Sequence, residues 1–347
     1  MTFILSFWDT ENGAQGGKIN VPRFKTEEEI QRYLDFVRFI VSHFKDRIEY
    51  YEIWNEPNIE NKEQWIEVDD YINLVKRAVP VIRQEYPEAK IVVGSTYSLM
   101  IEESRDYLFA VLGSDIMPLV DVVSWHGWHD ISPEQEELRD YYYEYPSIVQ
   151  EIKDTASAHG FEGEYIADEL HWTPPGTTTP WFIQEYSETK CAKFYARGII
   201  MHLGMDVSVS QLYIVPGEHP WQIVHTIENL CTVMSGAEPM DPQLEIQLER
   251  ESGFSCACNH VENFRHYCFS LPNGDNLVAL WIDGVAVDED PGINTTVTIY
   301  GVTAQKVVGI DVLYGLEQEL IAGIEDGNIA IEHLLVKDYP ILLLLSH

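Results

Sequence analysis

Two glutamates, Glu56 and Glu169, each end an apolar stretch of the sequence. Two carboxyl groups that face each other are the minimum equipment for cleaving a glycosidic bond. One protonates the leaving oxygen, and the other attacks the sugar or activates a water. The first must hold its proton near neutral pH while the second stays ionised. Whether these two glutamates can meet depends on the elements that carry them.

Both glutamates are expected where a buried strand opens into a loop. The run from Tyr50 to Trp54 is apolar and aromatic, and Asn55, Glu56 and Pro57 follow it. Residues 163–169 form a similar run that ends at Glu169. In an α/β barrel, the loops at the carboxyl ends of the strands line one open pocket. Barrel closure would therefore bring both side chains to the same mouth.

The first two thirds of the chain alternate between strand-like and helix-like patterns. Strands are expected at 3–7, 50–54, 89–95, 120–125, 163–169 and 207–215, and helices at 26–44, 68–84, 103–112, 147–159, 189–203 and 221–234. This alternation predicts parallel strands wrapped by helices. After Gly236 short alternating runs separated by turns predict an antiparallel β-sandwich. We expect a barrel domain over 1–237, a sandwich domain over 238–347, and a linker at 238–247.

Composition excludes several classes of partner. The chain has 57 acidic and 22 basic residues, a formal net charge of −35, which argues against nucleic acid or an anionic membrane. A well-solvated surface or a saline habitat would explain that charge. No apolar run approaches the roughly 18 residues of a membrane span. No signal peptide is recognisable, so a cytoplasmic protein and a secreted one that lacks its N-terminus both stay open.

Neither a metal nor another cofactor is expected. Five cysteines cannot form a complete disulfide framework within one chain. A metal cluster of Cys256, Cys258 and Cys268 with His260 and His266 is disfavoured against inert cysteines or one disulfide, because the Cys-x-Cys spacing is not that of common zinc sites. His126 and His129, with Asp168 or His171, are similarly favoured as hydrogen-bonding groups over metal ligands.

Three segments carry a resemblance to a known group of enzymes. Trp54-Asn55-Glu56-Pro57-Asn58 resembles the WNEP signature of clan A glycoside hydrolases, which are retaining (β/α)8 enzymes. Residues 122–128 and 165–172 resemble the strand-6 and strand-7 segments of that clan. The resemblance covers about residues 1–235, and a trailing β-sandwich is familiar from families 39, 44 and 51, with family 39 nearest.

The resemblance implies a function and roles for individual residues. Glu56 would be the acid/base, Glu169 the nucleophile and Asn55 the hydrogen-bond donor to the sugar 2-hydroxyl. The implied activity is double-displacement hydrolysis of β-linked oligo- or polysaccharides. The alternative is a catalytically weak or inactive carbohydrate-binding protein derived from such an enzyme.

Aromatic and histidine side chains near strand ends are candidates for a sugar-binding rim. Flat rings can stack on pyranose faces, although core packing is the alternative for each. We expect sugar contacts foremost from Trp128 and Trp172, and less strongly from Trp8 and Tyr213. His126 is expected to hydrogen-bond to the candidate carboxylates or to the substrate.

The sequence contains fewer βα units than a full (β/α)8 barrel has. If the Trp54–Asn58 motif ends strand 4, residues 3–7 form strand 3, and the sequence contains nothing for strands 1 and 2. The fold class expected is therefore a TIM-type barrel that is incomplete at the N-terminus, with about six βα units. A truncated gene, an incomplete barrel and a covering second chain all fit. We favour an incomplete barrel whose open edges are buried in a homodimer.

Overall fold

The computed structural model describes residues 2–7, 21–60, 63–176, 184–213, 221–241, 243–250, 263–325 and 327–347. The chain divides into two compact units. The first comprises residues 1–128, 144–169 and 207–212, and the second comprises 129–143, 170–206 and 213–347. No helix within the described ranges is long and apolar enough to cross a membrane.

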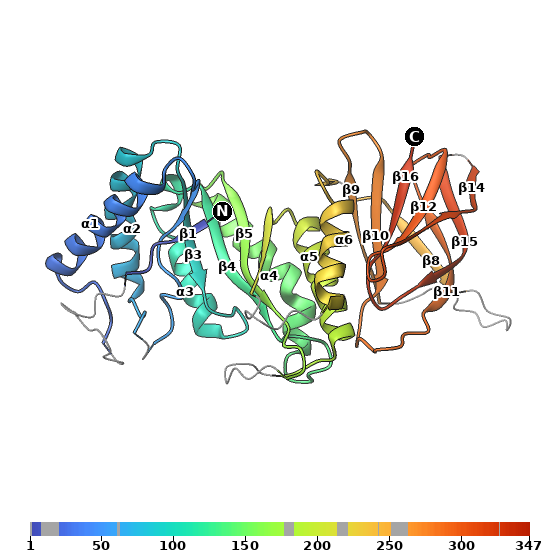
Figure 1. The fold of residues 1–347 in the computed structure, drawn as a ribbon, viewed down its shortest axis with the longest axis horizontal. Coiled ribbons are helices and arrows are strands. Elements are labelled where there is room, and N and C mark those ends of the chain that lie inside the picture. The colour runs from blue at the N-terminus through green and yellow to red at the C-terminus, as the bar shows by residue number, and fades with distance from the viewer. Residues whose placement is uncertain are drawn as a thin grey trace. The chain divides into compact units, whose positions relative to one another are not determined.

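The first unit is built on a curled parallel sheet of six strands that follow one another in chain order. The strands are β1 (Thr2–Ile4), β2 (Tyr50–Glu52), β3 (Lys90–Thr96), β4 (Val122–His129), β5 (Glu164–His171) and β6 (Val209–Leu212). Strands β3, β4 and β5 run side by side in Figure 1. Because β1, β2, β3 and β4 pair in parallel, their carboxyl ends lie at one edge, as the alternating pattern predicts.

Helices connect these strands, as expected for βα units. They are α1 (Glu27–Phe44), α2 (Val68–Glu85), α3 (Glu102–Leu112), the short 3-10 helix η1 (Met117–Leu119) and α4 (Arg139–Ala158). Helix α1 begins where the sequence predicts, since the Thr26 side chain accepts a hydrogen bond from the Glu29 amide.

Helix α4 is longer than the sequence pattern predicts. It begins at Arg139, within a tyrosine-rich segment ahead of the helix start expected at residue 147. Tyr142 and Tyr145 are fully buried and three residues apart, which is helical spacing. Pro146 lies inside the helix, and a proline at that point favours a break in a sequence-based interpretation.

The second unit combines two helices with two antiparallel sheets. The helices are α5 (Glu188–Gly204) and α6 (Trp221–Val233). The six-stranded sheet has the order β13 (Leu316–Leu320), β12 (Lys306–Asp311), β16 (Ile341–Ser346), β10 (Asn276–Ile282), β9 (Phe264–Ser270), β7 (Glu238–Pro239). The four-stranded sheet has the order β14 (Ala322–Glu325), β15 (Asn328–Val336), β11 (Ile293–Ile299), β8 (Ile246–Arg250). Both appear in orange and red in Figure 1.

Residues of both antiparallel sheets contribute to one hydrophobic core. Leu248 of β8 and Val297 of β11 belong to the same buried cluster as Val278 of β10 and Leu343 of β16. These side chains come from strands in which buried and more exposed positions alternate, or from the fully buried centre of a sheet. The antiparallel architecture expected for the C-terminal part is therefore confirmed.

The expected linker at 238–247 is wrong. Strand β7 pairs with β9, and β8 pairs with β11 from Ile246 onward, so both ends of that stretch are part of the sheets. Buried Ile246 and Leu248 alternate there with more exposed Gln247 and Glu249. This alternation is only two periods long and heavily polar, so it is too short to predict a strand. The domain boundary at 237–238 stays a prediction.

Candidate active site

The chain leaves strand β2 through a turn with unusual backbone geometry. Trp54 and Glu56 have φ angles of 71° and 48°, in the left-handed region that residues with a side chain seldom adopt. Two backbone hydrogen bonds to β3 fix this turn. The Ile53 amide donates to the Val92 carbonyl at 2.9 Å, and the Glu56 amide donates to the Ser95 carbonyl at 2.9 Å. Backbone strain of this kind persists where the surroundings over-determine it, and it is commonest at functional sites.

The Trp54 side chain anchors the turn. It is fully buried, and its indole nitrogen donates to the Gln64 carbonyl at 2.8 Å. The Phe24 ring meets it edge-on at a centroid distance of 5.2 Å. The Arg23 guanidinium lies 5.0 Å from its ring centroid. Trp54 therefore packs in the core and holds Asn55 and Glu56 in place.

A local irregularity of β3 directs the backbone of that strand toward the turn that carries Glu56. The register between β3 and β4 shifts between Val93 and Thr96. Gly94 and Ser95 both have positive φ angles, of 111° and 45°. A side chain at Gly94 is excluded, because its Cβ would lie 2.2 Å from the Ser124 carbonyl oxygen. As a result the Ser95 carbonyl accepts the hydrogen bond from the Glu56 amide. The Ser95 hydroxyl donates to Glu52 at 2.6 Å.

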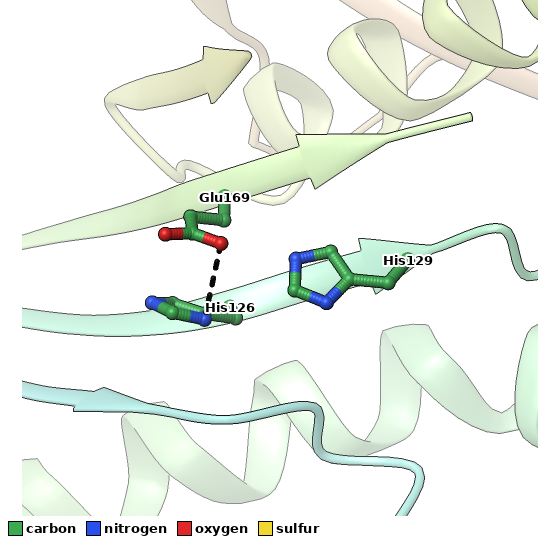
Figure 2. Close-up of side chains that lie close together, drawn as sticks. All are labelled: His126, His129 and Glu169. Carbon is green, nitrogen blue, oxygen red and sulfur yellow. Dashed lines mark ion pairs between the residues drawn. The ribbon is translucent and has the colours of Figure 1, made fainter. Parts of the chain in front are cut away.

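Glu56 and Glu169 meet at one ring nitrogen of His126. The His126 Nδ1 atom lies 3.3 Å from Glu56 Oε1 and 3.5 Å from Glu169 Oε2. Figure 2 shows the His126 ring beneath the Glu169 carboxylate, together with His129, the last residue of β4. The His126 side chain is 1% exposed, whereas those of Glu56 and Glu169 are 17% and 22% exposed. The histidine thus lies behind two carboxylates that remain reachable from solvent.

The surrounding carboxylates favour the charged form of His126. Burial opposes its charged form, but Glu169, Asp168 and Glu56 outweigh that effect and raise the pKa of His126 to about 10. Its Nε2 atom lies 3.8 Å from Asp168 Oδ1. A protonated imidazole at this point holds both glutamates by charge-assisted contacts. The hydrogen-bonding role expected for His126 from the sequence stays a prediction.

Two further carboxyl groups lie deeper in the same unit. Glu52 and Asp168 are 3% and 4% exposed. Burial, reinforced by the Asp168 charge, raises the pKa of Glu52 well above its ordinary value. Burial also raises the pKa of Asp168, although the His126 charge works against this. Sequence reasoning missed Glu52 as part of the site, and its only local signal was an acid within an apolar strand.

Two side chains from loops complete the surroundings of the paired carboxylates. The Gln64 amide donates to Glu56 Oε2 at 3.2 Å. Burial, followed by the charges of Glu56 and Glu169, raises the pKa of Tyr97. Neither residue stood out in the sequence. Their side chains reach the site from separate loops, and no spacing rule connects them to Glu56.

Other candidates from the sequence have different positions. Asn55 is partly exposed beside Glu56, with its Oδ1 atom 3.4 Å from the Ser95 hydroxyl. Trp128 and Trp172 are fully buried, which corrects the expectation that their rings offer a stacking face to a sugar. The Trp128 ring packs 4.5 Å from that of Tyr145.

The remaining candidates lie in the second unit or outside the described residues. The Trp172 indole donates to the Ile131 carbonyl at 2.9 Å. Tyr213 is 43% exposed, and its carbonyl oxygen lies 2.6 Å from His171 Nδ1. Trp8, Cys256, Cys258 and His260 fall outside the described residues, and Cys268 is a buried free thiol.

The fold and the carboxylate pair together place the chain in a structural class. The curled parallel sheet is similar in fold to solved structures of glycoside hydrolases. No protein-family profile matches the sequence, and no curated protein matches it. The solved structures nevertheless confirm, at the level of the fold, the resemblance inferred from the Trp54–Asn58 motif.

Three of these structures illustrate the similarity. A family 39 glycoside hydrolase from Bacteroides cellulosilyticus has a TM-score of 0.58 at 13% identity, over 96% of this chain and 65% of its own. A family 51 arabinofuranosidase from Xanthomonas axonopodis has a TM-score of 0.60 at 13% identity, over 92% and 73%. A family 44 endoglucanase from Clostridium thermocellum has a TM-score of 0.56 at 12% identity, over 90% and 70%. The chain thus spans less than two thirds of the family 39 structure.

Proposed function

We propose that this protein is a retaining O-glycoside hydrolase of the clan A type that cleaves β-linked oligo- or polysaccharides. The observation that carries the proposal is the contact of Glu56 and Glu169 with the same nitrogen of His126. Contact with one nitrogen brings the two carboxyl groups into one site. Short separation is what direct attack requires, whereas inverting enzymes keep room for a water between the two groups.

The proposed reaction has two displacements. Glu56 donates its proton to the leaving oxygen while Glu169 attacks the anomeric carbon, so that the glycosidic bond breaks as a glycosyl–Glu169 ester forms. Glu56 then removes a proton from water, which attacks the same carbon and releases Glu169. The contact with His126 holds the Glu169 carboxylate in the site. Asn55 binds the sugar 2-hydroxyl, where hydrogen bonds strengthen in the transition state.

The scaffold that we propose is an incomplete (β/α)8 barrel of about six units followed by a β-sandwich. Strands β1 and β6 form the edges of the parallel sheet within the described residues. Ile4 and Val209 on these strands are 38% and 43% exposed. Open edges with exposed apolar side chains favour association. We propose a homodimer that covers them, and light scattering that shows only a 39.9 kDa monomer would refute it.

Hydrolysis of aryl β-glycosides and of soluble glucans, xylans and mannans tests the activity. Glu169→Gln should abolish turnover, because no other described residue takes the position of the nucleophile. Glu56→Gln should lower kcat/KM by about 10²–10⁴-fold on substrates with poor leaving groups. A good leaving group should restore much of that loss because it departs without a proton, and added azide should then speed breakdown of the glycosyl–enzyme because it attacks without a general base. The matched control is Glu88→Gln, which changes an exposed acid and should retain activity.

Two outcomes would refute the proposal or replace it. Turnover that survives Glu169→Gln would exclude the nucleophile role. Specific binding of the same glycans by the wild-type chain without any turnover would favour the alternative of a carbohydrate-binding protein.

A further inference from the structure

An open cavity of about 680 Å³ lies in the first unit beside the candidate active site. This volume falls in the range of roughly 300–1,000 Å³ that is typical of ligand sites. The cavity lies between the segment that follows Glu56 and helix α3. Its lining includes the aromatic residues Trp65, Tyr97 and Tyr107 and the aliphatic residues Ile59 and Ile101.

Tyr97 links the cavity to the paired carboxylates. Tyr97 lines the cavity, and burial followed by the charges of Glu56 and Glu169 raises its pKa. The Tyr97 amide donates to the Asn58 side chain at 2.9 Å, and the Asn58 amide group donates to the Ser104 hydroxyl at 2.9 Å. Asn58 and Ser104 both line the cavity. One wall of the cavity therefore includes Asn58, two residues after Glu56 in the chain.

The rim of the cavity is acidic. Glu60, Glu67, Glu103 and Asp106 line it. Lys25 forms an ion pair with Glu67, and it is the one cation that pairs with a rim carboxylate within the described residues. Aromatic rings with an acidic rim suit a ligand that has flat apolar faces and hydroxyl or amino groups. They disfavour a ligand that carries carboxylates, because like charges repel across a short distance.

We propose that this cavity binds the sugar units on one side of the hydrolysed bond, and that it accepts neutral or amino sugars and rejects uronic acids. The inference rests on the proposed function, because it assigns the substrate class of the same site. Trp65 supplies a stacking face, and the acidic rim supplies the charge selection. This proposal predicts that the enzyme prefers long neutral glycans over glucuronic-acid-bearing ones.

The first experiment measures the stacking contribution of Trp65. The kcat/KM of wild type and Trp65→Ala is compared on an aryl β-glycoside of one sugar and on the matching hexasaccharide. The loss should be about tenfold larger on the hexasaccharide, since a lost ring contact of about 1.4 kcal/mol is a factor of ten. Trp221→Ala removes a ring that is 72% exposed on helix α6 and should change neither value. Equal losses on both substrates would overturn the inference.

The second experiment tests charge selection without requiring turnover. Calorimetry on the Glu169→Gln chain measures the affinity for hexamers of xylose and of glucosamine and for a glucuronic-acid-bearing xylo-oligosaccharide. The acidic ligand should bind at least about tenfold more weakly, and the combined Glu103→Gln and Asp106→Asn exchange should reduce that gap at low ionic strength. Glu88→Gln is the matched control and should leave the gap unchanged.

The two experiments separate failure of this inference from failure of the proposed function. If the protein hydrolyses none of the substrates but binds the neutral hexamer through Trp65, the proposed hydrolase function is refuted. The inference that the cavity binds neutral sugars then still holds. A chain that binds the acidic ligand as tightly as the neutral one refutes the charge selection, whether or not it is active.

Discussion

At the scale of single residues, two glutamates only four positions apart in the sequence, Glu52 and Glu56, have different environments. Glu56 is partly exposed and contacts the protonated His126. Glu52 is buried, and its partner is the neutral Ser95 hydroxyl. Burial therefore raises the pKa of Glu52, whereas Glu56 stays partly exposed to solvent.

Glu52→Gln should raise the stability of the protein at neutral pH. Because the pKa of Glu52 is raised in the folded state, the folded chain binds a proton that the unfolded chain releases above pH of about 4.3. Stability therefore falls as pH rises above that value. A glutamine avoids this cost and still accepts the Ser95 hydrogen bond.

The pH profile of unfolding distinguishes this cause from others. In urea titrations the variant should match wild type near pH of about 4 and exceed it by about 1 kcal/mol or more at pH 7. The exposed Glu88→Gln exchange serves as control and should follow wild type throughout. A constant difference at all pH values would mean that packing, and not ionisation, sets the cost of Glu52.

At the scale of elements, the irregularity in β3 is what brings the site together. Gly94→Ala should destabilise the protein by about 3 kcal/mol or more, because the new Cβ would lie 2.2 Å from the Ser124 carbonyl oxygen. Strand β3 would have to separate from β4, and Ser95 would move away from Glu52 and Glu56. Loss of activity should therefore accompany loss of stability.

Gly274 provides the matched control for this exchange. It also has a positive φ angle, of 89°, but no atom lies within 4 Å of the position that a Cβ would occupy there. Gly274→Ala should cost only the backbone strain, about 1 kcal/mol, and leave activity unchanged. Similar costs for the two variants in thermal unfolding would refute the account of β3.

Helix α5 is fixed within the second unit by a buried ion pair. Lys193 Nζ lies 2.6 Å from Asp338 Oδ1, and the two side chains are 2% and 9% exposed. Asp338→Ala should destabilise the protein by about 3–5 kcal/mol, since it leaves a buried ammonium group without its carboxylate. The exposed pair of Lys306 and Glu319 is the control, and Glu319→Ala should cost less than about 1 kcal/mol. Equal shifts in the urea midpoint would contradict this.

Apolar periodicity predicted most helices and strands of this chain because burial of one face is a local property of the sequence. It did so for α1, whose cap and buried face both follow the pattern. The pattern could not reveal the shift in β3, which depends on the contact of Gly94 with the neighbouring strand. The same limit applies within the site. A motif located Glu56, whereas Gln64 and Tyr97 depend on how separate loops pack.

At the scale of the whole molecule, the dominant feature is the formal net charge of −35. Mutual repulsion of the acidic groups opposes the compact state, and it is screened as the Debye length falls from about 30 Å at 0.01 M salt to about 3 Å at 1 M. We therefore expect the thermal midpoint at pH 7.5 to rise by about 5 °C or more between 0.02 and 0.5 M sodium chloride.

The same titration at low pH is the internal control. Near pH 4.5, the isoelectric point expected from the sequence, the net charge is small and salt has little repulsion to screen. The rise in the thermal midpoint should therefore largely disappear there, because chloride has only a weak effect on apolar burial. An equal rise at both pH values would assign the effect to hydration and not to charge. A rise confined to pH 7.5 would mean that the acidic surface costs stability in dilute buffer, which is the behaviour expected of a chain suited to saline surroundings.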